Sequence, residues 1–301
     1  MPHTGASGSC PAAGPESRPE AGPNARPAAG PILVCNGAEE RLQLIIGHVG
    51  GLGSPGSPGL SGLSDIRGGT EGATLRVSQE WVLPGQAMSV LAPALERSLA
   101  GLGLAVADLG GIACVRGPGG FTGLRLVLAF ALGLSAATGV PLAGLDYLPL
   151  LAANAARWRP ELTGDLWVLT HARSGQVYQQ GFVLVGGGLP PQDMTLPRAV
   201  SVECAAEAIL ARHGPAWLLG SGIRRNAAAF AACLGDVSLA GQAAPDQPES
   251  TPSAATPPLC DASPASSRIR ELPPLFDHPT PQVLLEQALT LSFTRAPVEP
   301  L

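Results

Sequence analysis

A glycine-rich segment, Gly117-Pro-Gly-Gly-Phe-Thr-Gly123, has the residue types and spacing that are best suited to chemistry. It follows an apolar run and precedes the apolar segment 124–138, so we expect a strand, a loop and a helix in that order. The backbone N–H groups of such a loop and the dipole of the helix can hold an anion such as phosphate.

The spacing of this loop does not match the known phosphate-binding fingerprints. It lacks the Lys-Ser/Thr end of a P-loop, and Thr122 stands where a dinucleotide-binding loop has its third glycine. Phosphate binding and a purely structural turn are both compatible with the pattern. The candidate phosphate- or nucleotide-binding residues are Gly117, Gly119, Gly120, Thr122, Gly123 and Arg125.

Other reactive residue types are scattered along the chain. The 5 histidines include no pair at metal-ligand spacing, and the 6 cysteines form no C-x-x-C pair, which disfavours zinc sites and redox dithiols. Ser221 lies between two glycines, but the G-x-S-x-G motif of a nucleophile elbow is absent, which disfavours a hydrolase. We therefore assign no catalytic residue and no metal ligand.

The composition excludes several further classes. The chain has 301 residues, is 45% hydrophobic and carries a net charge of -5, so it can bury a large core, and any contact with RNA must be local or supplied by a partner. It has no lysine, which excludes P-loop and Schiff-base mechanisms. The segment 124–137 is shorter than the roughly 20 residues that span a bilayer, so we expect a buried helix, no membrane contact and a cytoplasmic protein.

Hydrophobic periodicity predicts an α/β protein in which strands alternate with helices. Strands are expected at 31–36, 42–49, 74–83, 109–116, 140–145, 166–170, 177–185 and from 217 onwards. Helices are expected at 87–102, 124–138, 147–158, 202–213, 226–234 and from about 281 onwards. Residues 1–30 have the composition of a disordered leader, 50–72 that of a loop, and 241–274 that of a disordered insertion.

A resemblance to a known family is carried by three segments. Arg116-Gly-Pro-Gly-Gly-Phe-Thr-Gly-Leu-Arg125 resembles the signature of the TsaB (YeaZ) family, and Gly139-Val-Pro-Leu-Ala-Gly-Leu-Asp146 continues the match. Ala172-Arg-Ser-Gly-Gln-Val-Tyr178 resembles the D-A-R-x-G-E-V-Y segment of that family. The resemblance covers most of residues 31–185 and excludes the leader and the proline-rich insertion.

The resemblance implies an actin-like ATPase (ASKHA) fold with two lobes of mixed sheets flanked by helices. The first lobe would span 31–145 and the second 146–301, which would include the insertion and the C-terminal helix. It further implies a non-catalytic scaffold subunit that docks the catalytic paralogue TsaD in the complex that makes N6-threonylcarbamoyladenosine at position 37 of tRNA. A TsaE-like ATPase would also take part, tRNA would be bound only through the complex, and the subunit could form a homodimer.

Two departures from the family pattern favour a subunit without its own catalysis. An actin-like ATPase needs a carboxylate at the end of the first strand to position hydrated magnesium, and Asn36 stands there instead. His171 replaces the aspartate of the D-A-R motif. No cofactor is expected on the isolated chain, although ATP or ADP could bind at the partner interface. The alternative is an ATP-binding acyl or phosphoryl transferase that is active on its own.

In the family, helices of the first lobe pair with those of a partner. The resemblance therefore assigns partner binding to the predicted helices 87–102 and 124–138, where small residues such as Ala129 and Gly133 would permit close approach. The alternative is that these apolar residues cover the sheet of their own lobe. The partner-binding residues predicted here are Val90, Leu91, Leu95, Leu99, Leu124, Leu128 and Ala131.

Overall fold

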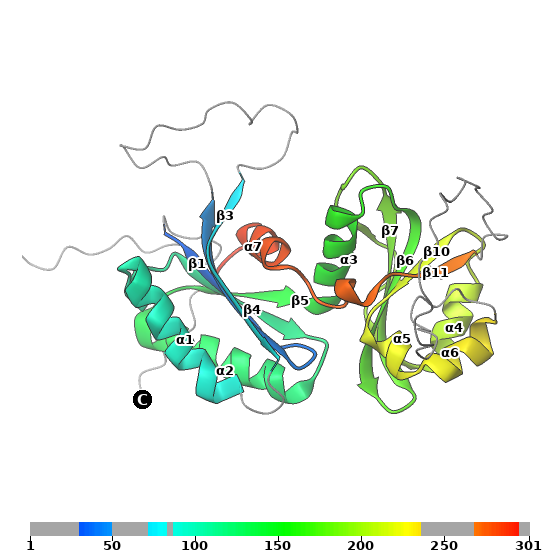
Figure 1. Ribbon diagram of the computed structural model, residues 1–301, viewed down its shortest axis with the longest axis horizontal. Helices are drawn as coiled ribbons and strands as arrows, with labels where there is room; N and C mark the ends of the chain where they lie inside the picture. The colour runs from blue at the N-terminus through cyan, green and yellow to red at the C-terminus, as the bar shows by residue number, and fades with distance from the viewer. Residues whose placement is uncertain (1–29, 50–71, 83–86, 236–267, 295–301) are drawn as a thin grey trace, which may run out of the picture.

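The computed structural model describes residues 30–49, 72–82, 87–235 and 268–294. These residues form two lobes that lie side by side, as Figure 1 shows. The predicted leader, apart from Gly30, and the predicted loop 50–72, apart from Gly72, lie outside the described residues.

The first lobe is built on a five-stranded mixed sheet. Its antiparallel part contains β1 (Ile32–Asn36), β2 (Arg41–Val49) and β3 (Ala73–Val82), and β4 (Gly111–Gly117) and β5 (Leu142–Asp146) run parallel to β1. The strand order is β3-β2-β1-β4-β5. Because β1 is completely buried and central, both of its faces need cover, which explains its continuous apolar sequence.

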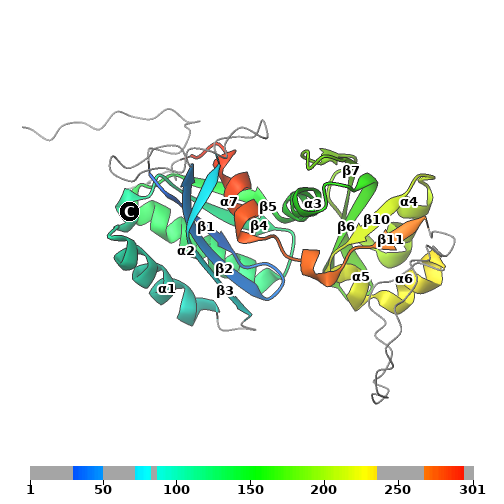
Figure 2. The ribbon, with the colours of Figure 1, turned by 45° about the horizontal axis from the view of Figure 1, so that its top comes forward.

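Helices cover both faces of this sheet. α1 (Ala87–Leu102) and α2 (Phe121–Thr138) lie on one face, and α7 (Pro281–Leu289) lies on the other, as Figure 2 shows. A short 3-10 helix, η1 (Val106–Asp108), joins α1 to β4. The left-handed conformation of Gly139, with φ of 70°, ends α2 as the sequence predicts.

The second lobe repeats the same strand order. Its central strand β6 (Thr163–Arg173) pairs antiparallel with β7 (Gln176–Val185), which in turn pairs with β8 (Gln192–Asp193) and β9 (Arg198–Ser201). On the other side, β10 (Ala216–Leu219) and β11 (Ile269–Glu271) run parallel to β6. The remaining helices of this lobe are α4 (Val202–Leu210), α5 (Ser221–Arg225) and α6 (Ala227–Leu234).

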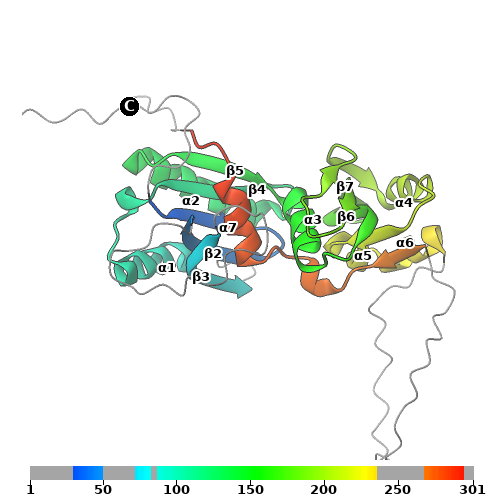
Figure 3. The ribbon, with the colours of Figure 1, turned by 90° about the horizontal axis from the view of Figure 1, so that it is seen from above.

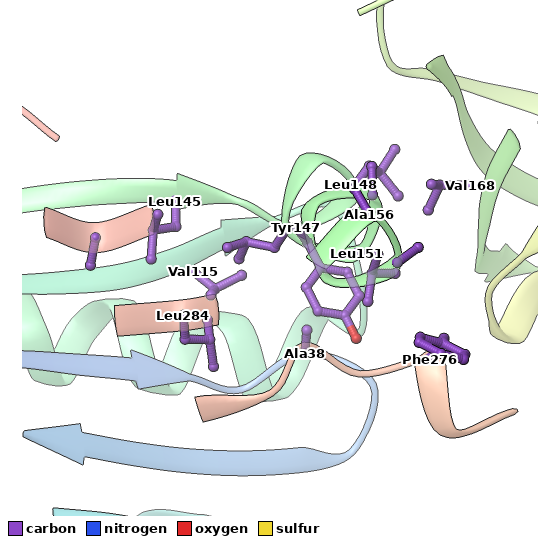
Figure 4. Packing of buried hydrophobic residues seen from close by; sticks show 14 of the residues in the cluster. Ala38, Val115, Leu145, Tyr147, Leu148, Leu151, Ala156, Val168, Phe276 and Leu284 are labelled. Atoms are coloured by element: carbon purple, nitrogen blue, oxygen red, sulfur yellow. The ribbon is translucent and has the colours of Figure 1, made fainter. Parts of the chain in front are cut away.

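The same arrangement of antiparallel and parallel strands, occurring twice, gives the predicted actin-like fold. The largest core cluster runs through both lobes and is centred on α3 (Tyr147–Trp158), which connects them. In Figure 4, Tyr147 lies between Ala38 and Val115 of the first lobe and Phe276 of the segment that returns from the second. The lobes therefore share a continuous apolar core.

Two predicted boundaries are wrong. The insertion was expected to run to residue 274, but β11 already belongs to the second sheet and is followed by the 3-10 helix η2 (Pro274–Phe276). The C-terminal helix α7 was assigned to the second lobe, but it packs against β2 and β3 of the first, as Figure 3 also shows. Its buried residues Leu284 and Leu285 complete the core of the first lobe, since that face of the sheet would otherwise be exposed.

Candidate functional site

The glycine loop lies where the sequence predicts it, between β4 and α2. Gly117 ends β4 with φ of 121°, a conformation that favours glycine, and the peptide bond to Pro118 is cis. Gly120 is the N-cap of α2 and is exposed, as is Thr122. The expected strand, loop and helix are therefore all present.

Gly123 has a packing role. A methyl group at Gly123 would lie 2.2 Å from the carbonyl oxygen of Gly37, and one at Gly37 would lie 2.5 Å from the carbonyl oxygen of Gly123. The first turn of α2 thus rests directly on the backbone that connects β1 to β2. This contact gives the structural reading of the motif a definite physical cause, because no larger side chain fits at either position without movement of the backbone.

The two arginines beside the loop are already engaged. Arg116 donates hydrogen bonds of 2.7 and 2.9 Å to the carboxylate of Asp146, and this pairing raises the pKa of Arg116. The guanidinium of Arg125 lies 3.6 Å from the ring centre of Phe121, a cation–π contact on the exposed side of α2. An anion in the loop would have to compete with these partners.

Asn36 occupies the strand end where an actin-like ATPase needs a carboxylate. Its side chain is fully buried and donates a hydrogen bond of 2.7 Å to the Oε1 atom of Gln43. Its Oδ1 atom accepts one of 3.0 Å from the backbone N–H of Ala38. The amide is therefore used in fixing the turn after β1, where both its donor and its acceptor group have partners.

The turn from β1 to β2 carries two glutamates in a conformation that is rare for them. Glu39 and Glu40 have φ values of 55° and 62°, in the left-handed region, and the turn is closed by a hydrogen bond of 3.1 Å from Arg41 N–H to the Ala38 carbonyl. Two consecutive left-handed residues define a type I′ turn, in which Asn and Gly are the usual residues. Such strain persists only where surrounding contacts stabilise it.

Those contacts come from the second lobe. The hydroxyl of Ser221, at the start of α5, hydrogen-bonds to the Glu39 carboxyl, while Arg225 lies 3.9 Å from Glu40. Burial raises the pKa of Glu39, and the Ser221 hydrogen bond and the charge of Arg225 oppose that rise. The turn thus bridges the two lobes, and its backbone lies beside the glycine loop, since the Glu39 nitrogen is 3.9 Å from a methyl group placed at Gly120.

A second group of charges lies in the segment that returns from the second lobe. Arg224 lies 2.8 Å from Glu271 and 3.0 Å from Asp277, so one guanidinium forms ion pairs with two carboxyl groups. Burial raises the pKa of Asp277 to about 7 against the opposing effect of Arg224, and it lowers the pKa of His278 to about 4. These residues close the junction between the lobes through buried electrostatic contacts.

His171 and Ser221 lie close together without forming a catalytic pair. The backbone N–H of His171 donates to the Ser221 hydroxyl at 3.2 Å, and the imidazole Nδ1 atom is buried without a hydrogen-bond partner in the described part of the chain. Among residues 30–49, 72–82, 87–235 and 268–294, no three His, Cys, Asp or Glu side chains are grouped as a metal site requires. Cys35 and Cys114 are buried, which raises the pKa of both thiols.

Most of the predicted partner-binding residues face their own sheet. Five of them have side chains that are at most 9% exposed: Leu91, Leu95, Leu99, Leu124 and Ala131. The prediction that these five residues form an exposed partner-binding surface is therefore wrong. Val90 and Leu128 are partly buried beside them. The periodicity of α1 and α2 marks the side of each helix that covers the sheet.

The opposite side of α2 is apolar and exposed, which corrects the expectation of a buried helix. The helix is long and apolar enough to cross a membrane by length and composition, yet only 22% of it is buried within the fold. Phe121 is 64% exposed and Leu132 is 43% exposed. Ala129, Gly133 and Ala136 are exposed on the same side, at the three- and four-residue spacing of one helix face. We call these five residues the α2 outer face.

Comparison with known proteins identifies relatives for the central part of the chain. The family described as "TsaD: tRNA N6-adenosine threonylcarbamoyltransferase" matches residues 86–203. The chain is 34% identical over 86 residues to the tRNA threonylcarbamoyladenosine biosynthesis protein TsaB of Buchnera aphidicola, covering 29% of this chain and 40% of that protein. It thus spans well under two thirds of that relative.

Two further matches are to a threonylcarbamoyltransferase and to a solved structure. The chain is 48% identical over 69 residues to the tRNA N6-adenosine threonylcarbamoyltransferase of Solidesulfovibrio magneticus, covering 22% of this chain and 19% of that protein. The solved structure of YeaZ from Pseudomonas aeruginosa aligns with a TM-score of 0.46 at 22% identity, covering 65% of this chain and 78% of YeaZ.

The segment matched by the family, residues 86–203, begins at α1, includes the glycine loop and α2, and continues into the second lobe to the start of α4. Both lobes have the strand order of the actin-like ATPase fold. Over part of its length, therefore, the chain is similar to TsaB proteins and to the threonylcarbamoyltransferase family.

Proposed function

We propose that this chain is a docking subunit of the machinery that makes threonylcarbamoyladenosine in tRNA, and that it binds a TsaD-like catalytic paralogue through the α2 outer face. The single observation that carries the proposal is that this helix is apolar on both sides and covered on only one. An exposed apolar face rimmed by polar residues is typical of a protein-binding surface.

The composition of the α2 outer face suits a helix-to-helix contact. Phe121 and Leu132 supply large apolar side chains, while Ala129, Gly133 and Ala136 let another helix approach closely. A paralogue that shares these helices would present a similar surface, so the two chains can pack about a pseudo-two-fold axis. The same geometry permits a homodimer when the paralogue is absent.

The junction between the lobes supports a role without independent catalysis. The strand-end amide of Asn36 is hydrogen-bonded through both its nitrogen and its oxygen, and the glycine loop lies beside the Glu39–Glu40 turn and arginines that already have partners. In this proposal the paralogue supplies the catalytic groups, tRNA is modified by the complex, and a TsaE-like ATPase assists it. Any ATP or ADP would bind where the subunits meet.

The decisive experiment compares two leucine-to-aspartate variants. Leu132→Asp places a charge in the proposed interface, and Leu196→Asp places the same charge at a leucine of the second lobe that is 75% exposed. We expect Leu132→Asp to weaken binding of the TsaD-like paralogue at least 30-fold in sedimentation velocity, equivalent to about 2 kcal/mol or more for an unpaired interfacial charge. Leu196→Asp should bind like the wild type.

Threonylcarbamoyladenosine in tRNA, measured by mass spectrometry, should fall in cells that carry only Leu132→Asp. Equal binding by both variants would contradict docking through α2. If wild-type chain and paralogue fail to associate at all, the proposed function itself is wrong. If the purified chain alone hydrolyses ATP or completes the transfer, the alternative of an independent transferase is correct.

A further inference from the structure

A charged groove lies on the second lobe, at the opposite end of its sheet from the junction. It has a volume of about 450 Å³, and Thr163, Trp217, Arg268 and Arg270 are among its lining residues. These residues lie at or near the N-terminal ends of the parallel strands β6, β10 and β11, whereas Ser221 follows the C-terminal end of β10. In Figure 1, α3 lies over β6 and β7, and β11 lies farther out at the edge of the lobe.

The guanidinium groups of the groove have no carboxylate partners among the described residues. Arg268 donates to the backbone carbonyl of Arg212, and Arg270 forms no ion pair in this part of the chain. The acidic group that lines the groove, Glu161, is neutralised by its ion pair with Arg159. The groove is therefore locally cationic, although the whole chain carries a net charge of -5.

An adjoining hollow adds no unpaired negative charge to the groove. It shares His213 and Pro215 with the groove and has a volume of about 240 Å³. There the Asp165 carboxylate is engaged by Arg212 through hydrogen bonds of 2.8 and 3.2 Å, so it does not offset the charge of the two groove arginines.

Trp217 gives the groove an aromatic wall. Its register partner on β11 is Arg270, whose guanidinium lies 5.7 Å from the indole ring centre. The indole N–H donates 3.0 Å to the carbonyl of Thr163, which fixes the orientation of the ring. Trp217 is only partly buried, so part of the ring is available to a ligand.

The strand geometry sets the spacing of the charges. Arg268 directly precedes β11 and Arg270 lies within it, on either side of the buried Ile269, and both line the groove, so their backbones are about 6.6 Å apart by the rise of an extended chain. Two guanidiniums at this spacing beside a fixed indole can bind phosphates of one nucleic acid strand while a base stacks on the ring. An acidic peptide would use the two charges but would gain little from the aromatic wall.

We propose that this groove binds a single-stranded segment of RNA, with phosphates at Arg268 and Arg270 and a base against Trp217. Since the catalytic paralogue would dock on α2 of the first lobe, this second-lobe groove would give the complex a separate RNA contact. The inference rests on the proposed function only in taking tRNA as the RNA, because the groove itself is defined without reference to a partner.

The test measures binding of a tRNA transcript and of a single-stranded oligouridylate to the full chain, alone and with its paralogue, by fluorescence anisotropy at several salt concentrations. The variant Arg268→Ala/Arg270→Ala should weaken binding of both probes about tenfold or more. It should also reduce the slope of log K against log salt by about 1.4, as two lost single-strand phosphate contacts predict. Trp217→Leu should weaken binding several-fold and leave that slope unchanged.

The matched control is Arg173→Ala/Arg198→Ala, which removes the same charge from exposed arginines elsewhere on the second lobe. Equal losses in the two double variants would overturn the proposal, since the effect would then be one of total charge. It would also be overturned if RNA binding were unchanged while binding of a polyglutamate peptide were lost.

Complex formation separates this inference from the proposed function. The groove variants should bind the paralogue like the wild type, and Leu132→Asp alone should bind oligouridylate like the wild type. Loss of RNA binding in the groove variant with an intact complex supports the groove, whereas unchanged affinity for both RNA probes refutes it, whatever the outcome for docking.

Discussion

The two lobes have the same strand order but differ in the surfaces that their outer layers present. In the first lobe, the helix after the fourth strand is α2, with 18 residues and exposed Phe and Leu side chains. In the second lobe, the corresponding region contains α5, with 5 residues, and α6, with 8, whose exposed side is mainly alanine. The same topology therefore carries exposed Phe and Leu side chains on α2 in one lobe and mainly alanine on the exposed side of α6 in the other.

The difference shows that the sheet determines where a surface lies and the side chains determine what the surface binds. The core side of each helix layer is under the same constraint in both lobes, because it must fill the space above a sheet. The outer side is free of that constraint. Phe121 and Leu132, both exposed on the outer side of one helix, thus indicate a function for that side, and the following predictions test this comparison.

The largest effect is expected from truncating core leucine and isoleucine in the two helix layers. Leu95→Ala in α1 and Ile209→Ala in α4 remove side chains that are 2% and 0% exposed, so each should lower the free energy of unfolding by about 2–5 kcal/mol. Leu132→Ala and Leu210→Ala, at 43% and 39% exposure, should change it by less than about 1 kcal/mol. Urea denaturation measures all four.

The binding assay completes this comparison. Of the two exposed leucines, only Leu132 should affect association with the TsaD-like paralogue. A stability loss at Leu132 as large as that at Leu95 would show that α2 is covered on both sides in the free chain, which would remove the basis for a docking face.

Much of the fold could be predicted from the sequence because it depends on local patterns. The bounds 87–102 and 147–158 were predicted to the residue, since apolar periodicity is strong there. β11 was missed because a three-residue strand beside a proline-rich segment has no periodicity to read. The placement of α7 on the first lobe was also missed, since a helix pattern shows that a face must be covered but does not identify the sheet that it covers.

The functional surfaces were less predictable. α2 is apolar on every side, so its sequence could not show which side faces solvent, and the residues chosen for docking were mostly core residues. The left-handed conformation of Glu39 and Glu40 was missed because glutamate is an unusual residue at such positions. Trp217 and Arg270 are neighbours because β10 pairs with β11. The two strands are separated in sequence by the insertion, so no local sequence pattern predicts this contact.

The second prediction concerns the buried charges that connect the lobes. Because the pKa of Asp277 is raised from 3.8 to about 7 in the fold, the unfolded chain binds fewer protons at this site between those values. Its contribution to stability should therefore fall as the pH rises from about 4 to 7, by at most about 1.4 kcal/mol per pH unit. The difference in stability between wild type and Asp277→Asn, measured by urea denaturation across this range, should change in that direction.

His278 provides a control of opposite sign. Its pKa is lowered from 6.5 to about 4, so the unfolded chain binds more protons than the fold between those values, and stability is lost as the pH falls. The wild type should thus gain stability over His278→Gln as the pH rises from 4 to 6.5. The same pH trend in both comparisons would show that the two groups do not titrate as the buried junction requires.

The third prediction tests whether the glycine loop is a packing contact. Gly123→Ala places a methyl group 2.2 Å from the Gly37 carbonyl oxygen and should lower the free energy of unfolding by about 1–3 kcal/mol through overpacking. Gly133→Ala, in the same helix with no atom within 4 Å, should raise it by about 0.5–1 kcal/mol because alanine favours the helix. Similar values for the two variants in thermal denaturation would contradict direct contact between α2 and the β1–β2 turn.

The smallest effect is expected at Arg125. Its guanidinium stacks on Phe121 at the exposed side of α2, so Arg125→Ala should cost less than about 1 kcal/mol of stability. The loop is held by the Gly37–Gly123 contact and not by this arginine, so the variant should stay folded and bind ATP no differently from the wild type in calorimetry. Loss of tRNA modification in an intact complex would assign Arg125 to a site formed with the partner. A loss of ATP affinity in the isolated chain would instead identify the glycine loop as a nucleotide-binding site. The first lobe would then differ from the second mainly by that site and not by its exposed apolar face.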